Sequence, residues 1–153
     1  VYLVRHGKAQ AQAVGGDPAR PLTPEGRSEI AAAALGLKAL GASPTAVWHS
    51  GYVRARETAE IIASALGVAT LVVDSALTPA ASAERAIEVL SAANAHALLC
   101  VSHMPLLPSL VAALVGARVD FGTGTAAHIS LEPMTTLRGL WSQSALSLIG
   151  RVR

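Results

Sequence analysis

The sequence has little cysteine, few aromatic side chains and few charges, and each scarcity excludes a class of protein. Cys100 is the only cysteine among 153 residues, so neither an intrachain disulfide framework nor a thiol cluster for zinc can form. Aromatic residues make up 3% of the chain, too few for a surface on which nucleic-acid bases stack. Charged residues make up 14% and the formal net charge is +2, which indicates neither a nucleic-acid nor a membrane partner.

Long apolar runs and several common ligand-binding motifs are missing too. No uninterrupted apolar stretch reaches the length of a membrane span, and no segment resembles a signal peptide. Together with the single cysteine, this predicts a protein of the reducing cytoplasm. Walker, GxGxxG and GxSxG motifs are absent, as are histidines and carboxylates at metal-ligand spacing. We therefore expect no metal and no cofactor.

The chain is instead rich in alanine and leucine and is 52% hydrophobic, a composition that suits helices packed closely on a sheet. Strands are predicted at 1–4, 45–49, 70–73 and 97–101, and helices at 24–40, 54–67, 83–93 and 108–115. Two further strands, 126–131 and 137–142, are typical of an antiparallel hairpin. The pattern predicts an α/β fold of three layers: a mainly parallel central sheet with helices on both faces and a C-terminal antiparallel hairpin.

No repeat, low-complexity tract or linker interrupts the chain, and its length gives one domain room for a full core. We therefore assign residues 1–153 to a single domain. In parallel sheets the active crevice lies beyond the carboxyl ends of the strands. The tripeptide RHG at 5–7 follows the first predicted strand, Ser50 follows the second and His103 follows the fourth.

The tripeptide RHG is common by chance. Its position at the end of a strand is what indicates a functional role. His6 could aim one ring nitrogen into the crevice while the other donates to a backbone carbonyl. Arg5 supplies a guanidinium fork suited to phosphate. Gly7 lets the chain turn sharply and a ligand approach the backbone.

Arg54 and Arg56 lie two residues apart on one predicted helix, so they cannot both face one site. Arg54, in the first turn above the second strand, is better placed to reach the crevice, where the helix N-terminus also favours an anion. We interpret Arg56 and Glu57 as solvated. Arg20 by itself is an ordinary arginine of the long polar loop at 7–24.

The remaining histidines and the cysteine have weaker patterns. His49 points away from Ser50 if its strand alternates, while His96 and His128 lie in or beside strands without evident partners. We interpret all three as packing or surface residues. Cys100 lies in a buried strand and reads as a small core residue.

Five segments occur in the order typical of one family: LVRHG, RPLTPEG, HSGYVRARET, an LTP tripeptide and VSHMPL. On these motifs the chain resembles the histidine phosphatase superfamily, with its phosphoglycerate mutase-like fold, from residue 1 to about residue 110. Its short length, the RPLT loop and the LTP segment resemble SixA-type phosphohistidine phosphatases. Such enzymes need no metal and act on a phosphohistidine-bearing protein.

The resemblance implies a role for each matching position. His6 would be the nucleophile that takes the phosphoryl group, with Arg5, Arg54 and His103 around it. Arg20 would complete the phosphate clamp. Ser50 and Gly7 are expected to contribute to substrate binding, and phosphate or sulfate is expected to occupy the pocket.

A phosphoryl group in transfer carries negative charge on its equatorial oxygens, so positioned cations can supply much of the catalysis. We expect the three arginines and a charged His103 to provide this charge. The arginines should also disfavour protonation of His6 and keep its attacking nitrogen free.

Two positions depart from the family pattern. SixA-type chains often carry an acid just before LTP, where this chain has Ala76, and the Lys8 after RHG has no assigned role. An alkoxide leaving group needs an acid, and Glu57 and Asp74 are only the nearest carboxylates. Because imidazole leaves more easily, the missing acid favours phosphohistidine. The alternatives are a broad phosphomonoesterase of the phosphoglycerate mutase-like type and a non-catalytic phosphate-binding module.

Overall fold

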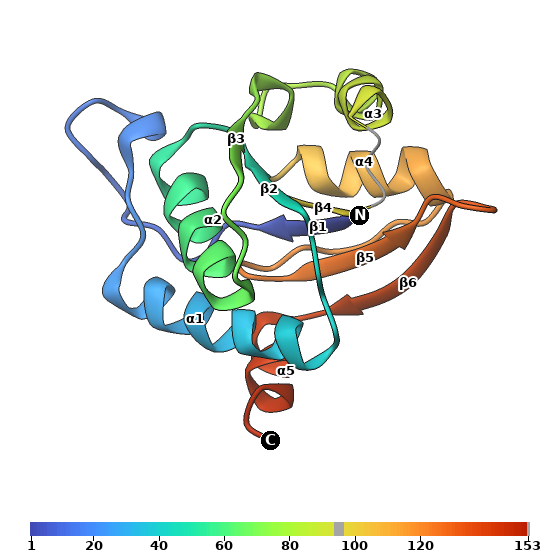
Figure 1. Ribbon diagram of the computed structural model, residues 1–153. Coiled ribbons are helices and arrows are strands. Elements are labelled where there is room, and N and C mark those ends of the chain that lie inside the picture. The colour runs from blue at the N-terminus through green and yellow to red at the C-terminus, as the bar shows by residue number, and fades with distance from the viewer. Residues whose placement is uncertain (94–96, 153) are drawn as a thin grey trace.

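A computed structural model describes residues 1–93 and 97–152 of the chain (Figure 1). Its strands form one sheet in the order β3-β2-β4-β1-β5-β6. The bounds are β1 Tyr2–Arg5, β2 Ala46–His49, β3 Leu71–Val73, β4 Leu98–Ser102, β5 Ala126–Ser130 and β6 Thr136–Trp141. Strands β1 to β4 pair in parallel, whereas β5 runs antiparallel to β1 and to β6. The predicted mainly parallel sheet with a C-terminal hairpin is confirmed.

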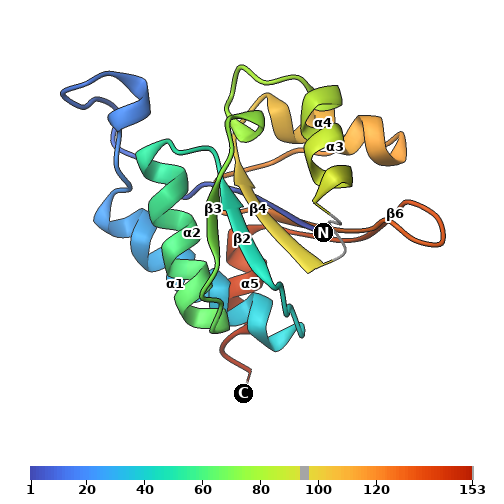
Figure 2. The same ribbon diagram turned by 45° about the horizontal axis from the view of Figure 1, so that its top comes forward.

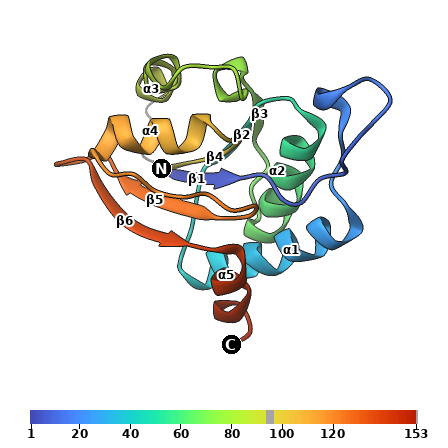
Figure 3. The same cartoon turned by 180° about the vertical axis from the view of Figure 1, so that it is seen from behind.

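Helices cover both faces of the sheet (Figures 1 and 2). Their bounds are α1 Pro24–Ala39, α2 Val53–Leu66, α3 Ala83–Ala92, α4 Leu106–Val115 and α5 Gln143–Ile149, with short 3-10 helices η1 Asp17–Ala19 and η2 Ser75–Leu77. Seen from behind, α3 and α4 lie on one side of the sheet and α1, α2 and α5 on the other (Figure 3). Each side has its own apolar cluster against the sheet, so the three predicted layers are present.

Local sequence signals explain where the main elements begin and end. Thr23 caps α1, because its Oγ1 accepts a hydrogen bond from the Gly26 N–H over 2.9 Å. Helix α2 ends at Gly67, whose φ of 73° lies in the left-handed region that glycine adopts at little cost. All five residues of β4 are buried, as expected for a central parallel strand covered on both faces.

Two helices differ from the sequence-based expectation by more than one residue. Helix α5 was not predicted, because its seven residues give too few turns for a clear apolar period. It packs on α1 at Gly36, where a Cβ atom would come within 2.1 Å of the Leu146 carbonyl oxygen. Helix α4 begins at Leu106, two residues before the expected start.

Within residues 1–93 and 97–152, no helix is both long and apolar enough to span a membrane. The sheet brings the carboxyl ends of its central strands to one edge: Arg5 of β1 lies opposite Ser102 of β4. The next residue, His6, continues this pairing, since its N–H donates to the Ser102 carbonyl over 3.1 Å. The loops that follow the strands therefore start side by side.

Candidate active site

Three strand ends bring His6, Ser50 and His103 into one cluster. The imidazole centroids of His6 and His103 are 4.9 Å apart, with the rings inclined at 53°. The Ser50 Oγ lies 2.6 Å from the His103 Nε2. All three side chains are buried. The structure therefore assembles, from three separate loops, the residues that the strand-end rule singled out.

The His6 ring has a fixed tautomer. Its Nδ1 lies 2.8 Å from the Gly7 carbonyl oxygen, and because a carbonyl only accepts, Nδ1 carries the proton. The Nε2 lone pair is left to accept from the Arg54 Nε over 3.2 Å. Burial, followed by the positive charges of Arg54, Arg5 and Arg20, lowers the pKa of His6 to about 4. His6 is thus a neutral imidazole at pH 7, as expected, although burial outweighs the arginines.

His103 is neutral too, which corrects the expectation of a charged residue. Burial, then His6 and Arg54, lowers its pKa to about 3, because a second cation beside these groups is unfavourable. Ser50 fixes the ring: its Oγ accepts from the Tyr52 N–H over 3.3 Å and forms a hydrogen bond with the His103 Nε2, in which the tautomer of the ring sets the donor. A bound phosphoryl dianion would raise the pKa of His103 and favour its charged form.

Tyr52 and Thr58, two residues of the α2 segment, support the cluster without having been predicted to do so. The centroids of the Tyr52 and His103 rings are 5.0 Å apart. The Arg54 Cζ lies 4.9 Å from the Tyr52 centroid. The Thr58 Oγ1 donates to the Arg54 carbonyl over 2.7 Å and accepts from the Gly7 N–H over 3.1 Å. Helix α2 is thereby fastened to the turn that carries the nucleophile candidate.

The buried Arg54 guanidinium contacts both His6 and a carboxylate that sequence analysis overlooked. Its Nη2 lies 2.9 Å from the Asp17 Oδ2, and its Nη1 donates to the Asp17 carbonyl over 2.7 Å. Arg20 approaches the same carboxylate, with Nη1 2.6 Å from Oδ1, and its Nε donates to the Gln10 carbonyl over 2.6 Å. Arg20 thus bonds to Asp17 and Gln10, and it acts on the pKa of His6 through its positive charge.

Asp17 could have been noticed from the sequence GGDPAR. It precedes Arg20 by three residues, a spacing that permits an ion pair in a single turn. Gly15 and Gly16 have φ angles of 103° and 78°, which allow the chain to turn back so that η1 lies against α2. Only the fold shows that the carboxylate also reaches Arg54.

Arg5 leaves one buried donor unused at this cluster. Its Nη1 donates to the Phe121 carbonyl over 2.6 Å, while its Nε has no partner. The only other buried side-chain nitrogen or oxygen without a partner, among the residues that the structure describes, is the His103 Nδ1. Buried polar groups are nearly always hydrogen-bonded, so two orphaned nitrogens in one cluster indicate a place for a ligand with acceptor atoms.

The interpretation of the helix 54–67 charges holds for Arg56 and fails for Glu57. Arg56 is exposed, and its Nε lies 3.8 Å from the Glu60 Oε1. Glu57 is buried rather than solvated: its Oε2 accepts from the Leu22 N–H over 2.7 Å, and its Oε1 pairs with Arg27. It ties the loop to α2, and both of its oxygens are occupied.

The other carboxylate considered as an acid is occupied as well. The Asp74 Oδ1 accepts from the Ala76 N–H over 2.8 Å and so caps η2. Lys8 forms an exposed ion pair with Glu25, which gives this residue a place on the surface of α1. Both oxygens of Glu57 are thus bound by other groups, and Asp74 has one oxygen bound in the cap of η2.

Packing explains the glycine at position 7. The residue is buried, its φ lies outside the left-handed region, and a Cβ atom would come within 2.6 Å of the Ile30 Cγ1. Any side chain would push the turn away from α1. The requirement for glycine thus comes from contact with the helix, and not from a sharp turn as the sequence suggested.

His49 and His128 lie outside the cluster. His49 is buried, and its Nδ1 accepts from the Gly51 N–H over 3.2 Å. His128 has a partner after all: its ring stacks on Tyr2 with centroids 4.2 Å apart. His96 is outside the described residues. Cys100 is a buried free thiol, and burial raises its pKa to about 12.

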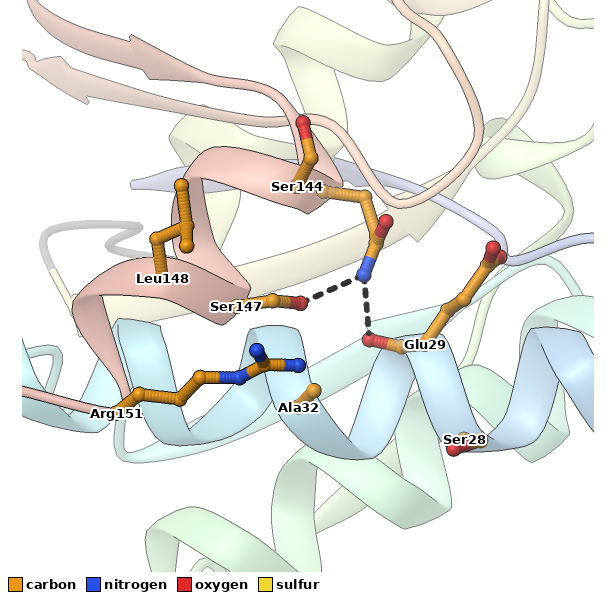
Figure 4. Close-up of a pocket in the computed structure, with 8 residues that line it drawn as sticks. Ser28, Glu29, Ala32, Ser144, Ser147, Leu148 and Arg151 are labelled. Atoms are coloured by element: carbon orange, nitrogen blue, oxygen red, sulfur yellow. Dashed lines mark hydrogen bonds between the residues drawn. The ribbon is translucent and has the colours of Figure 1, made fainter.

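A separate hollow of about 400 Å³ lies between α1 and α5 (Figure 4). There the Gln143 amide donates to the Glu29 carbonyl over 3.1 Å and to the Ser147 hydroxyl over 2.7 Å. The bond to Glu29 joins α5 to α1, and the bond to Ser147 lies within α5. Across residues 1–93 and 97–152, no group of three or more histidine, cysteine, aspartate or glutamate side chains could hold a metal ion.

Known proteins are similar to this chain in both sequence and architecture. Residues 1–81 match the model of the histidine phosphatase superfamily (branch 1). Phosphohistidine phosphatase SixA of Escherichia coli (strain K12) is 29% identical over 154 residues, covering 97% of this chain and 95% of the relative.

Solved structures agree with these matches. The protein histidine phosphatase SixA complexed with tungstate is 30% identical, with a TM-score of 0.88 over 95% of this chain and 97% of that one. A phosphoglycerate mutase from Bacillus anthracis str. Sterne shares the fold, with a TM-score of 0.76 at 16% identity over 97% and 95% of the two chains. The chain is accordingly a hydrolase of the phosphatase class and belongs to the histidine phosphatase superfamily, branch 1.

Proposed function

We propose that this phosphatase removes the phosphoryl group from phosphohistidine on a signalling or phosphotransfer protein in the cytoplasm, with His6 as the nucleophile. The proposal rests on the contacts of the His6 Nε2 and on the unpaired donors in the same cluster. This unprotonated nitrogen accepts from Arg54 over 3.2 Å, and the same cluster holds the orphaned Arg5 Nε and His103 Nδ1. Tungstate, a phosphate-like oxyanion, is bound by the SixA relative.

The first chemical step transfers the phosphoryl group to His6. The Nε2 lone pair forms a bond to phosphorus while the P–N bond to the substrate imidazole breaks, and that bonding pair stays on the substrate ring. The His6 Nδ1–H, held by the Gly7 carbonyl over 2.8 Å, keeps the attacking ring in orientation. Arg5 and Arg54 stabilise the charge on the phosphoryl oxygens.

In the second step, water attacks phosphorus and the P–Nε2 bond breaks, with its bonding pair returning to Nε2. The protons of the water leave with the phosphate, and His6 is restored as the neutral ring protonated on Nδ1. Ser50, through the His103 Nε2 at 2.6 Å, keeps the orphaned Nδ1 turned toward the anion as a donor. No metal is required, because guanidinium groups supply the positive charge. Arg20 contributes through Asp17 and through its field at His6.

The carboxylates favour phosphohistidine over ordinary phosphate esters. Both oxygens of Glu57 are bound by other groups, and Asp74 uses its Oδ1 to cap η2. Hydrogen bonds from Arg54 and Arg20 hold the pKa of Asp17 below its ordinary value, so this carboxylate stays ionised and is a poor acid. An alkoxide leaving group needs a proton, whereas a phosphoimidazole whose other nitrogen is protonated leaves as a neutral ring.

The test is to incubate the protein with a ³²P-phosphohistidyl protein and to trap the enzyme by rapid quenching. We expect an acid-labile, alkali-stable label on the wild type and none on His6→Ala. His128→Asn is the matched control, since His128 stacks on Tyr2 away from the cluster, and it should label like the wild type. Tight phosphate binding without labelling or turnover would support the non-catalytic module instead.

Substrate class is tested by comparing that phosphoprotein with glycerol phosphate, an unactivated ester. The proposal predicts much faster turnover of the phosphoprotein. Equal rates on both would point to the broad phosphomonoesterase, because such an enzyme must supply the missing acid.

A further inference from the structure

The Arg54 guanidinium presents two different edges to its surroundings. The edge between Nη1 and Nη2 faces Asp17, with distances of 2.7 Å to the carbonyl oxygen and 2.9 Å to Oδ2. The Nε, on the other edge, faces the His6 Nε2 over 3.2 Å. Because the group is planar with five N–H donors in fixed directions, fixing one edge also fixes the other.

Asp17 does not use the donors on the edge that faces His6. Asp17 uses one N–H of Nη1 and one of Nη2, so the second N–H of Nη2 still points to the side of Nε. A phosphoryl group on the His6 Nε2 would meet these donors without displacing Asp17. The carboxylate thus lies behind the arginine, as seen from the nucleophile.

Asp17 is itself held from a second direction. Its Oδ1 lies 2.6 Å from the Arg20 Nη1, and Arg20 is fixed by its bond to the Gln10 carbonyl. One carboxylate therefore bridges two guanidinium groups that would otherwise repel each other beside the anion site. The Arg54 side chain is only 5% exposed whereas that of Asp17 is 51% exposed, so Asp17 joins a buried cation to the loop surface.

We propose that Asp17 is a positioning residue that, by binding the Nη1–Nη2 edge, aims the Nε–Nη2 edge of Arg54 at the phosphoryl group on His6. The inference rests on the proposed function, since it assumes that a phosphoryl group reaches His6. It assigns the 15–20 turn a part in catalysis: this turn sets the direction of a cation that another element supplies. Asp17 neither touches the phosphoryl group nor transfers a proton.

The experiment compares Asp17→Ala and Asp17→Asn with the wild type, using the phosphohistidyl protein for kcat and KM and tungstate for equilibrium binding. We expect Asp17→Ala to lower kcat by about 10- to 100-fold, the scale for a misdirected catalytic group, and to weaken tungstate binding. Asp17→Asn keeps a carbonyl oxygen for Nη2 and should recover part of the loss. Glu88→Gln, which removes another exposed arginine partner on α3, should leave both measurements unchanged.

A second experiment measures the effect of Asp17→Ala on activity in an Arg54→Lys background, which separates positioning of Arg54 from a purely structural role. A lysine has no second edge to be aimed, so Asp17→Ala should cost little further activity in that background. The inference is overturned if the two losses multiply, if Asp17→Ala behaves as the wild type, or if it binds tungstate more tightly, which would make Asp17 a competitor of the anion. A wild type that neither labels on His6 nor binds tungstate would instead overturn the proposed function itself.

Discussion

Helix α2 carries two ion pairs whose buried members have opposite charge. At Arg54 the buried member is the cation, with a side chain 5% exposed against 51% for Asp17. Three residues later the buried member is the anion, with Glu57 11% exposed against 48% for Arg27. The Arg54 pair joins α2 to η1, between β1 and α1, and the Glu57 pair joins α2 to α1 itself. Only the Arg54 pair borders the candidate nucleophile.

The difference lies in what else each buried group touches. Arg54 donates a third hydrogen bond to the His6 Nε2, a side-chain atom that can react. The second oxygen of Glu57 accepts a hydrogen bond from the Leu22 N–H, a backbone group that takes no part in chemistry. Similar charged partners on one helix therefore support chemistry in one case and chain geometry in the other, so removing them should affect different measurements.

The largest effect is expected for Arg54→Ala. The substitution removes a buried guanidinium that stabilises the charge of the transferring phosphoryl group, and kcat/KM should fall by about 10³-fold. Arg56→Ala is the matched control, because Arg56 is an exposed arginine on the same helix, and it should keep wild-type activity. Equal losses in the two variants would mean that the general charge of α2, and not the Arg54 contact, matters.

Glu57→Ala should act on stability rather than on turnover. It leaves the Leu22 N–H without the acceptor at 2.7 Å, and an unsatisfied buried donor lowers the free energy of unfolding by about 2 kcal/mol. Urea unfolding measures the loss, with Glu60→Ala as the exposed control. If folded Glu57→Ala lost its activity at undiminished stability, Glu57 would belong to the chemistry and the comparison would fail.

The pKa of His6 should separate the two pairs electrostatically. Arg54 is among the groups that lower this pKa to about 4, so Arg54→Ala should raise it toward the ordinary value, and Glu57→Ala should not. NMR titration of the imidazole nitrogens measures both. An unchanged pKa in Arg54→Ala would show that burial alone keeps His6 neutral.

The same shift fixes the sign of a pH effect on stability. Since folding lowers the His6 pKa from 6.5 to about 4, the unfolded chain binds more protons between these values. The contribution of His6 to stability is thus complete above pH 6.5 and is lost as the pH falls toward 4. The pH dependence should be shallower in His6→Asn, measured by urea unfolding.

The smallest effect is expected for Arg27→Ala, which removes the exposed member of the second pair. Because a half-exposed ion pair contributes little, the free energy of unfolding should fall by only about 0.5 kcal/mol. The Leu22 N–H keeps its acceptor, and kcat should not change. A loss as large as that of Glu57→Ala would assign the stabilisation to the ion pair instead of the backbone contact.

Sequence analysis found the residues that come directly after strands. His6, Ser50 and His103 could be placed together because parallel strands end at one edge of their sheet, and Arg54 because it opens the helix after one of these strands. It did not find Asp17 or the burial of Glu57. Asp17 belongs to the loop at 7–24, and Glu57 accepts a hydrogen bond from Leu22 of the same loop. The path of this loop across α2 decides both contacts, and the loop has no helical or strand periodicity that would predict its path.

Helix α5 shows a similar limit. Ser142 caps this helix, because its Oγ accepts from the Ala145 N–H over 3.2 Å. The helix is nevertheless too short to be stable without α1 beneath it, and the close approach at Gly36 is a property of the pair. The charge state of His103 was mispredicted for a related reason: burial and neighbouring cations decide it.

The sequence by itself determined the α/β order of elements, the strand ends and the identities of the groups that can bind an anion. These follow from local periodicity and from the rule that joins chain order to one sheet edge. Only the tertiary structure decided which nitrogen of each histidine is free, which carboxylate binds which arginine and which ionisable groups are charged when buried. Such properties depend on distances of a few ångströms between segments far apart in the chain, and on how much water the fold removes around them.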